Sequence, residues 1–358
     1  MLRATSEINV RDADALLGRL CEHFEEHGDV VHAGSEGRVS FGYGSAVLKA
    51  DAQGLRVAVE AGTEIYLSYM KMGVVEHVLE MAEGPVAEVR WQADGLLGGV
   101  PLFFRQMRVV SSQRLTPHMQ RVRLSGEDLA RFNDDGLHVH LVFPPKGREP
   151  VWPTLGADGR IVWPQGDDYL HRRVYTLRRV DPVEGWVEID LVLHEGGDMP
   201  GAVFAETAQP GDIVGMTGPG GGLVPEADAL FLFGDETALP AIARIVEELP
   251  VHARAKAVIE IDGPADEIAM PSKASVEIRY LHRDGAPAGT FGLLARVVRE
   301  TDLESLGPDP FVWVGCEFAD FRAIRSYLRK ELKMPKDRHL AVAYWRRGTA
   351  GDEARREA

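Results

Sequence analysis

The segment 234–242 reads Gly-Asp-Glu-Thr-Ala-Leu-Pro-Ala-Ile, and its residue types suit a nucleotide-binding turn. It follows the short apolar segment 229–233, which predicts a buried strand, and it opens the periodic segment 239–249, which predicts a helix. The carboxyl end of a parallel strand is where an α/β sheet holds a dinucleotide or the edge of a flavin. The segment lacks the Gly-x-Gly-x-x-Gly spacing, so by itself it does not predict a standard dinucleotide fold.

A second motif, Arg-Val-Tyr-Thr at 173–176, begins a predicted β-strand. Alternate side chains of a strand share one face, so Arg173 and Tyr175 are expected to point the same way. A guanidinium can bind a diphosphate with parallel hydrogen bonds, and a tyrosine beside it can cover a ring or a ribityl chain. The alternative is an arginine and a tyrosine on an exposed barrel face.

Residues 190–202 predict a strand followed by a glycine-rich turn and the start of a helix. They read Asp-Leu-Val-Leu-His and then Glu-Gly-Gly-Asp-Met-Pro-Gly-Ala. Small residues let backbone N–H groups approach a phosphate, and a helix N-terminus favours an anion. The motif therefore suits phosphate binding, with an ordinary strand-to-helix turn as the alternative.

Aromatic residues stand at the ends of two later strands, in Trp-Val-Gly-Cys-Glu at 313–317 and in Tyr-Trp at 344–345. An aromatic pair at such a place can cover a planar ring, and packing within the last strand is the alternative. Cys316 has no evident histidine partner, so a nucleophilic thiol is not expected. The sequence also shows no zinc-binding Cys/His spacing, no P-loop and no Gly-x-Ser-x-Gly.

Three regions are predicted to carry these motifs. Residues 1–95 predict a small α+β domain, with helices at 11–27 and 63–82 around alternating strands. The first helix is predicted from apolar residues that recur at helical spacing, namely Ala13, Leu16, Leu17, Leu20 and Phe24. The Gly-Leu-Leu-Gly-Gly stretch at 95–99 is expected to be a linker.

Residues 100–222 contain short β-rich segments separated by turns and predict an antiparallel β-barrel. Within them, 145–168 predicts a long loop over the barrel mouth.

Residues 226–348 alternate short apolar strands with helices and predict a parallel, doubly wound α/β sheet. The expected strands are 229–233, 257–261, 276–281, 311–314 and 340–345, and the expected helices are 239–249, 291–299 and 318–332.

Composition limits the function classes. The chain has 358 residues, 45% of them hydrophobic, and a formal charge of −15. This charge argues against general binding to nucleic acid or to an anionic membrane. No apolar run approaches the ~20 residues of a membrane span, so no membrane insertion is expected. Two distant cysteines and the absence of a signal peptide predict a cytoplasmic protein.

Taken in order, these motifs resemble the siderophore-interacting proteins, a branch of the ferredoxin-reductase-like flavoproteins. The resemblance covers about 100–348, and segment 234–242 is its most specific part. It implies an FAD-binding barrel, an NAD(P)H-binding α/β domain, and reduction of a ferric siderophore to Fe(II) in the cytoplasm by NADH or NADPH, with a ferredoxin as an alternative donor. Residues 1–90 look like a small domain of unknown role that is sometimes fused ahead of this family.

The resemblance also implies which residues contact the cofactors. No protein acid, base or metal ligand is required, because the flavin carries the chemistry. The expected cofactor-binding residues are Arg173, Val174, Tyr175, Thr176, Asp190, Leu193, His194, Pro200, Gly201, Ala202, Gly234, Asp235, Glu236, Thr237, Ala238, Pro240 and Trp345.

Three positions depart from the family pattern. The phosphate turn ends in Pro-Gly-Ala at 200–202 where the family usually has Pro-Ala-Ser, so a serine hydroxyl is missing. His140 stands where a lysine is common. Cys316 replaces a usual glycine beside the expected nicotinamide.

The sequence leaves several alternatives open. Glu260 and Asp262 could hold the ribose diol of NADH, whereas His282 and Arg283 could bind the 2′-phosphate of NADPH; of the two, we favour NADH. The runner-up function is a general NAD(P)H:flavin or electron-transfer reductase. A protein that binds flavin or siderophore without turnover is a further alternative.

Overall fold

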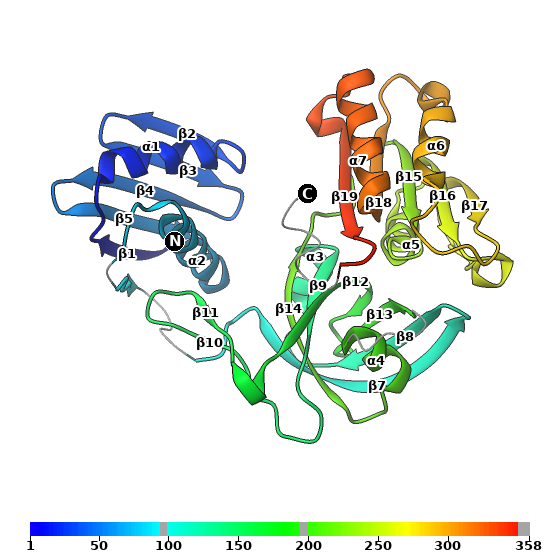
Figure 1. Ribbon diagram of the computed structural model, residues 1–358, viewed down its shortest axis with the longest axis horizontal. Coiled ribbons are helices and arrows are strands. Elements are labelled where there is room, and N and C mark those ends of the chain that lie inside the picture. Colours follow the sequence, from blue (N-terminus) through cyan, green and yellow to red (C-terminus); the bar gives the residue numbers. More distant parts are fainter. Residues whose placement is uncertain (87, 94–98, 194–199, 350–358) are drawn as a thin grey trace. The chain divides into compact units, whose positions relative to one another are not determined.

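The computed structural model describes residues 1–86, 88–93, 99–193 and 200–349. These residues form two compact units (Figure 1). The first contains residues 1–104 and 145–170, and the second contains 105–144 and the chain from 171 onward. In the described part of the chain, no helix is long and apolar enough to cross a membrane.

The first unit is an α+β domain, as predicted. Its six-stranded sheet has the order β2-β3-β4-β5-β1-β6. The elements are β1 (Leu2–Ile8), α1 (Ala13–Phe24), β2 (Asp29–Ala33), β3 (Glu36–Phe41), β4 (Gly44–Asp51), β5 (Gly54–Ala61), α2 (Glu64–Met81) and β6 (Gln92–Ala93). The sequence reading missed strands β1, β2 and β6. In β2 most side chains are exposed, so the strand shows no buried alternation.

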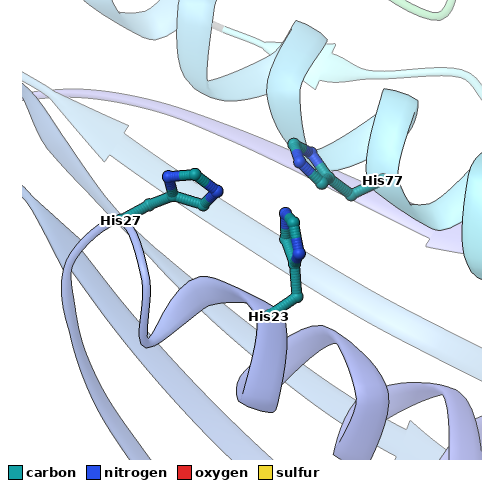
Figure 2. A group of neighbouring side chains, drawn as sticks. All are labelled: His23, His27 and His77. Carbon is teal, nitrogen blue, oxygen red and sulfur yellow. The ribbon is translucent and has the colours of Figure 1, made fainter. Parts of the chain in front are cut away.

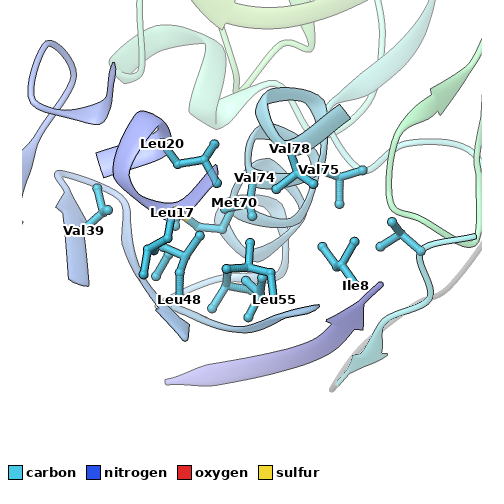
Figure 3. Packing of buried hydrophobic residues seen from close by; sticks show 14 of the residues in the cluster. Ile8, Leu17, Leu20, Val39, Leu48, Leu55, Met70, Val74, Val75 and Val78 are labelled. Atoms are coloured by element: carbon cyan, nitrogen blue, oxygen red, sulfur yellow. The ribbon is translucent and has the colours of Figure 1, made fainter. Parts of the chain in front are cut away.

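Both helices of this unit bury an apolar face against the sheet (Figure 3). Leu17 and Leu20 of α1 and Val74 and Val78 of α2 lie in one cluster with strand residues such as Leu48. Each fully buried aliphatic side chain of this kind stabilises the fold by about 1.5–3 kcal/mol. The helical spacing of α1 therefore predicted its buried face correctly.

Residues 145–170 belong to the first unit, although the sequence suggested a loop over the barrel mouth. The segment holds a two-stranded ribbon of β10 (Thr154–Leu155) and β11 (Ile161–Val162), and a short turn of helix at Gly166–Asp168. The indole of Trp91 donates to the carbonyl of Asp158 at 2.8 Å, and the N–H of Leu155 donates to Gly99 at 2.8 Å. These contacts secure the segment to the N-terminal domain.

The second unit begins with the predicted antiparallel barrel, which closes in the order β12-β13-β8-β7-β14-β9. Its elements are β7 (Phe104–Thr116), β8 (Met119–Ser125), α3 (Ala130–Asp134), β9 (His138–Phe143), β12 (His171–Asp181), β13 (Trp186–Val192), α4 (Pro200–Thr207) and β14 (Ile213–Gly220).

A five-stranded sheet follows, in which every neighbouring pair of strands is parallel. Its order is β17-β16-β15-β18-β19. The elements are β15 (Ala229–Asp235), α5 (Leu239–Glu248), β16 (Arg254–Ile261), β17 (Ser275–His282), α6 (Leu293–Glu300), β18 (Phe311–Glu317), α7 (Phe318–Ser326) and β19 (His339–Trp345), with short helical turns at Pro264–Asp266, Leu303–Leu306, Tyr327–Glu331 and Lys336–Arg338.

The central strand β15 shows why this sheet is covered on both faces. Leu230 and Leu232 pack in a cluster with α5, whereas Phe231 and Phe233 pack in a second cluster with α6 and α7. The chain proceeds from β15 outward to β17 and then returns to the other side of β15 as β18. The strand order therefore reverses between β15 and β18, and ligands of doubly wound sheets bind at the carboxyl ends of strands at such a point.

Candidate functional site

The barrel side of the candidate site is formed by β12 and the first turn of α4. A methyl group added at Gly201 would lie 2.0 Å from the hydroxyl oxygen of Tyr175 and 3.7 Å from Cγ of Arg173. Only glycine therefore lets this helix approach the strand so closely. The structure brings Arg173, Tyr175 and Gly201 together beside a helix N-terminus, which favours an anion.

The guanidinium of Arg173 is not neutralised by a carboxylate of the described residues. The side chain is half-buried, and its Nη1 donates to the carbonyl of Arg172 at 2.7 Å. Among the described residues no carboxylate forms an ion pair with it, whereas Arg121, Arg123 and Arg178 of the same barrel all have carboxylate partners. An uncompensated guanidinium next to a glycine-lined turn suits a diphosphate.

Asp190 has a different environment from the one its motif suggested. Its buried carboxylate accepts two hydrogen bonds from Arg121, at 2.7 and 2.8 Å, and lies 3.9 Å from Nε of Arg178. The carboxylate is thus occupied by the barrel's own arginines. A contact between Asp190 and the flavin stays a prediction.

The other predicted barrel residues lie near this motif or outside the described residues. Thr176 is buried and pairs with His138 of β9, and Val174 pairs with His140. Leu193 is buried in the barrel core. Pro200 and Ala202 lie in the first turn of α4. His194 lies outside the described residues.

Two glycines on neighbouring strands shape the α/β side of the site. Gly234 of β15 pairs with Gly315 of β18. A Cβ at Gly234 would come within 2.7 Å of the Ala238 side chain, and one at Gly315 within 2.9 Å of the rings of Trp313 and Tyr344. The strand ends therefore pack directly against the start of α5, where Pro240 occupies the first turn as predicted.

Asp235 connects this edge of the sheet to the last strand. Its Oδ1 accepts hydrogen bonds from the backbone N–H and the hydroxyl of Thr237, at 2.9 and 2.5 Å. Its Oδ2 accepts from the N–H of Glu317 at 3.0 Å and from the indole of Trp345 at 2.8 Å. Burial raises the pKa of the Asp235 carboxyl, and these four donors oppose that shift.

The arginine that could have bound a 2′-phosphate is already surrounded by carboxylates. The side chain of Arg283 is buried, and its Nη1 donates to Glu236 at 2.6 Å and lies 3.7 Å from Glu260. Its Nη2 lies 4.0 Å from Asp262. The other cationic candidate, His282, lies 2.9 Å from Glu267.

Two of these carboxyl groups titrate unusually. Burial, and then the neighbouring Asp235 carboxylate, raises the pKa of Glu260 to about 7, although Arg283 acts in the opposite direction. Burial likewise raises the pKa of Glu236, and Arg283 again opposes it. This edge of the sheet therefore concentrates acidic groups.

The side chain of Cys316 lies in the interior of the α/β domain. Its side chain is fully buried in the cluster with α6 and α7. Burial, together with the carboxylates of Asp235 and Asp320, raises the pKa of the thiol well above its usual value. The thiol therefore does not obstruct the strand end, and a nucleophilic role is disfavoured.

Sequence reasoning missed the contacts that join the barrel to the α/β domain. Nε2 of His138 on β9 lies 2.7 Å from the hydroxyl of Tyr344 on β19. Arg178 of β12 pairs with Glu247 of α5 at 2.7 Å. No local pattern marks either pair, because their partners lie 206 and 69 residues apart in the chain.

Comparisons with known proteins identify the family. A model described as siderophore-interacting protein matches residues 227–348, and one described as siderophore-interacting FAD-binding domain matches residues 108–223. The chain belongs to the siderophore-interacting protein family. The barrel is the FAD-binding domain of that family. Residues 5–92 match a third model, described as an uncharacterized protein conserved in bacteria (DUF2218).

Curated relatives of this siderophore-interacting protein include two reductases. The ferric vibriobactin reductase ViuB of Vibrio cholerae is 30% identical over 248 residues, which are 68% of this chain and 90% of the relative. The NADPH-dependent ferric-chelate reductase of Escherichia coli K12 is 30% identical over 251 residues, covering 68% of this chain and 93% of the relative.

Solved structures show the same fold. A siderophore utilization protein from T. fusca is 38% identical with a TM-score of 0.61, and the match covers 69% of this chain and 94% of that one. The siderophore-interacting protein SipS from Aeromonas hydrophila is 27% identical with a TM-score of 0.57, covering 69% and 93%. The expected architecture of an antiparallel barrel followed by a parallel sheet is confirmed.

Proposed function

We propose that this protein is an FAD-dependent reductase that transfers electrons from NAD(P)H to ferric iron held by a siderophore. The relatives named above are reductases of ferric vibriobactin and of ferric chelates. The matched regions cover 90% and 93% of these relatives, so this chain contains the counterpart of nearly their whole length. Fe(II) binds siderophores weakly, and reduction therefore releases the metal.

One observation carries the proposal: Arg173 has no carboxylate partner among the described residues and lies against Gly201. The residues present fit FAD at this point, because a diphosphate supplies the negative charge that the guanidinium and the α4 N-terminus both favour. We assign Arg173 and the first turn of α4 to the diphosphate. Tyr175 and Thr176, next along β12, would flank the isoalloxazine ring.

Bound FAD would supply the redox chemistry, accepting a hydride from the nicotinamide and passing on single electrons to Fe(III). The role of the protein is to bind and orient. Thr237 and the N-cap residue Ala238 directly precede α5 at the strand switch point, where a nicotinamide nucleotide is expected. Asp235 holds Thr237 and Trp345 in place through its hydrogen bonds.

We propose NADH as the preferred donor. A 2′-phosphate needs an available cation, and both candidate cations, His282 and Arg283, face carboxylates at the strand ends. Glu236 and Glu260 lie beside Arg283 and would repel a further negative charge.

We place the reaction in the cytoplasm. Both cysteines, Cys21 and Cys316, are free and buried, which is typical of a protein in a reducing compartment.

The test is anaerobic absorbance spectroscopy of the purified protein with FAD. Addition of NADH should bleach the flavin, and a ferric siderophore should then restore the oxidised spectrum while Fe(II) appears. Absence of FAD binding would contradict the proposal. Bleaching by reduced ferredoxin but by neither nicotinamide would assign a ferredoxin donor and refute the nicotinamide role. Reoxidation by free flavin but by no ferric siderophore would indicate a general flavin reductase.

A further inference from the structure

Three histidines meet in the N-terminal unit, and none of them belongs to a motif expected to bind FAD or NAD(P)H (Figure 2). His23 lies in the last turn of α1, His27 in the turn that follows, and His77 on α2. The ring centroid of His23 lies 4.9 Å from that of His27 and 4.7 Å from that of His77. One ligand nitrogen from each residue lies within 4.8 Å of the other two.

Rigid elements hold this arrangement. Residues four apart lie on one face of a helical turn, which directs His23 and His27 the same way. The turn is closed by hydrogen bonds from the N–H groups of His27 and Gly28 to the carbonyl of Phe24, at 2.9 and 3.0 Å. The Phe24 ring packs 5.1 Å from His77, which fixes α1 against α2 at this level. All three rings therefore point toward one small volume.

The hydrogen bonding leaves nitrogens suited to a cation. Nδ1 of His77 lies 2.6 Å from the carbonyl of Gly73, so it must donate, and Nε2 then carries the free lone pair. This is the usual support of a metal-binding imidazole, whose second nitrogen donates to a carbonyl or carboxylate. Nε2 of His23 is buried and has no hydrogen-bond partner among the described residues. An unpaired buried polar atom is costly unless a ligand satisfies it.

The local charges also suit a cation. The carboxylates of Glu26 and Glu80 lie close enough to His23 to interact with it electrostatically, so negative charge stands near the three rings.

We propose that His23, His27 and His77 bind one divalent first-row transition-metal ion. Imidazole nitrogens suit Zn, Cu, Fe and Ni, whereas Ca²⁺ and Mg²⁺ require oxygen ligands. Three protein ligands, one of them the exposed His27, leave coordination positions open to water, as in exchangeable rather than closed structural sites. Fe(II), the product of the proposed reductase reaction, belongs to this class, but the site does not depend on that activity.

The test is calorimetric titration of the full-length, FAD-loaded protein with Zn(II), without nicotinamide. The wild-type protein should bind one equivalent in this site. His27→Ala changes an exposed residue and should keep the fold, yet weaken binding by about a hundredfold or more, beyond the 10–100-fold cost of losing an outer-shell partner. His32→Ala is the matched control, because His32 is an exposed histidine of the same sheet domain outside the cluster. It should bind as the wild type does.

A second group, His118, Asp262 and Asp266 in the other unit, provides the competing explanation for any bound metal. Its His118→Gln variant should retain the Zn(II) equivalent that His27→Ala loses. The proposal is overturned if the wild type binds no Zn(II), if His27→Ala binds as tightly as His32→Ala, or if only His118→Gln loses binding. Because no electron transfer is measured, these outcomes are independent of the reductase function.

Discussion

The indole of Trp345 donates a 2.8 Å hydrogen bond to Oδ2 of Asp235, across a chain separation of 110 residues. The other oxygen of the same carboxylate holds the hydroxyl and N–H of Thr237. A single buried side chain thus links the last strand of the sheet to the turn that opens α5. The aromatic residue and the turn are therefore positioned together.

Trp345→Phe tests the hydrogen bond between the indole and Asp235. The ring remains, but a buried carboxylate loses a donor, which costs about 1–3 kcal/mol of stability. We expect a lower melting temperature and slower reduction of bound flavin by NADH in stopped-flow absorbance. Trp91→Phe removes an indole hydrogen bond in the other unit, to Asp158. It should leave the flavin rate unchanged; equal slowing in both variants would refute a specific role for Trp345.

Arg173→Ala should weaken FAD binding about 10- to 100-fold, because a charged hydrogen bond to phosphate contributes about 1.5–3 kcal/mol. Fluorescence quenching of FAD during titration measures the effect. Arg114→Ala is the control, since Arg114 is an exposed arginine of the same barrel that donates to the carbonyl of Pro117. Equal FAD affinity of Arg173→Ala and Arg114→Ala would contradict the assignment.

Gly201→Ala should destabilise the flavin domain by about 1–3 kcal/mol, the usual cost of forcing an extra methyl into a packed site. The clash is with the hydroxyl of Tyr175, whose Cζ is farther away at 3.3 Å. In a Tyr175→Phe background the same substitution should therefore cost less. A double-mutant cycle on melting temperatures measures this coupling. Additive effects would show that Gly201 is not constrained by Tyr175.

Glu260 should make stability depend on pH. Its folded-state pKa of about 7 lies above the ordinary value of 4.5, so between these values the folded protein binds more protons than the unfolded chain. Stability from this group is therefore present at low pH and is lost as the pH rises through 7.

Glu260→Gln should consequently match the wild type at pH 5 and be more stable at pH 8, by on the order of 1–3 kcal/mol. Thermal melting at both pH values tests this. Glu277→Gln, at an exposed position of the same sheet, should show no such pH-dependent difference. A constant difference between Glu260→Gln and wild type at both pH values would refute the linkage.

Local patterns predicted much of this fold. Alternation of apolar residues and glycine-containing turns located the barrel, and the segment 229–249 predicted β15 and α5 nearly to their ends. The helical spacing of Leu16, Leu17, Leu20 and Phe24 predicted the buried face of α1. Such features depend on near neighbours in the chain, which is why a sequence reveals them.

Long-range pairings could not be predicted in the same way. The histidine cluster is an example: the spacing of His23 and His27 is visible, but only the packing of α1 against α2 brings His77 to them. The packing of residues 145–170 with the N-terminal domain depends on Trp91 and Gly99, which lie far from that segment in the chain. The contact between Gly201 and Tyr175 likewise exists only in the folded barrel.

The most direct test of the central claim is an anaerobic titration of the FAD-loaded protein, followed by addition of a ferric siderophore. The account predicts that NADH bleaches the flavin faster than NADPH does, that the siderophore restores the oxidised spectrum, and that a Fe(II) chelator captures a pair of ferrous ions for each NADH consumed. Flavin that binds but stays oxidised with both nicotinamides, or reduced flavin that no ferric siderophore reoxidises, would contradict it.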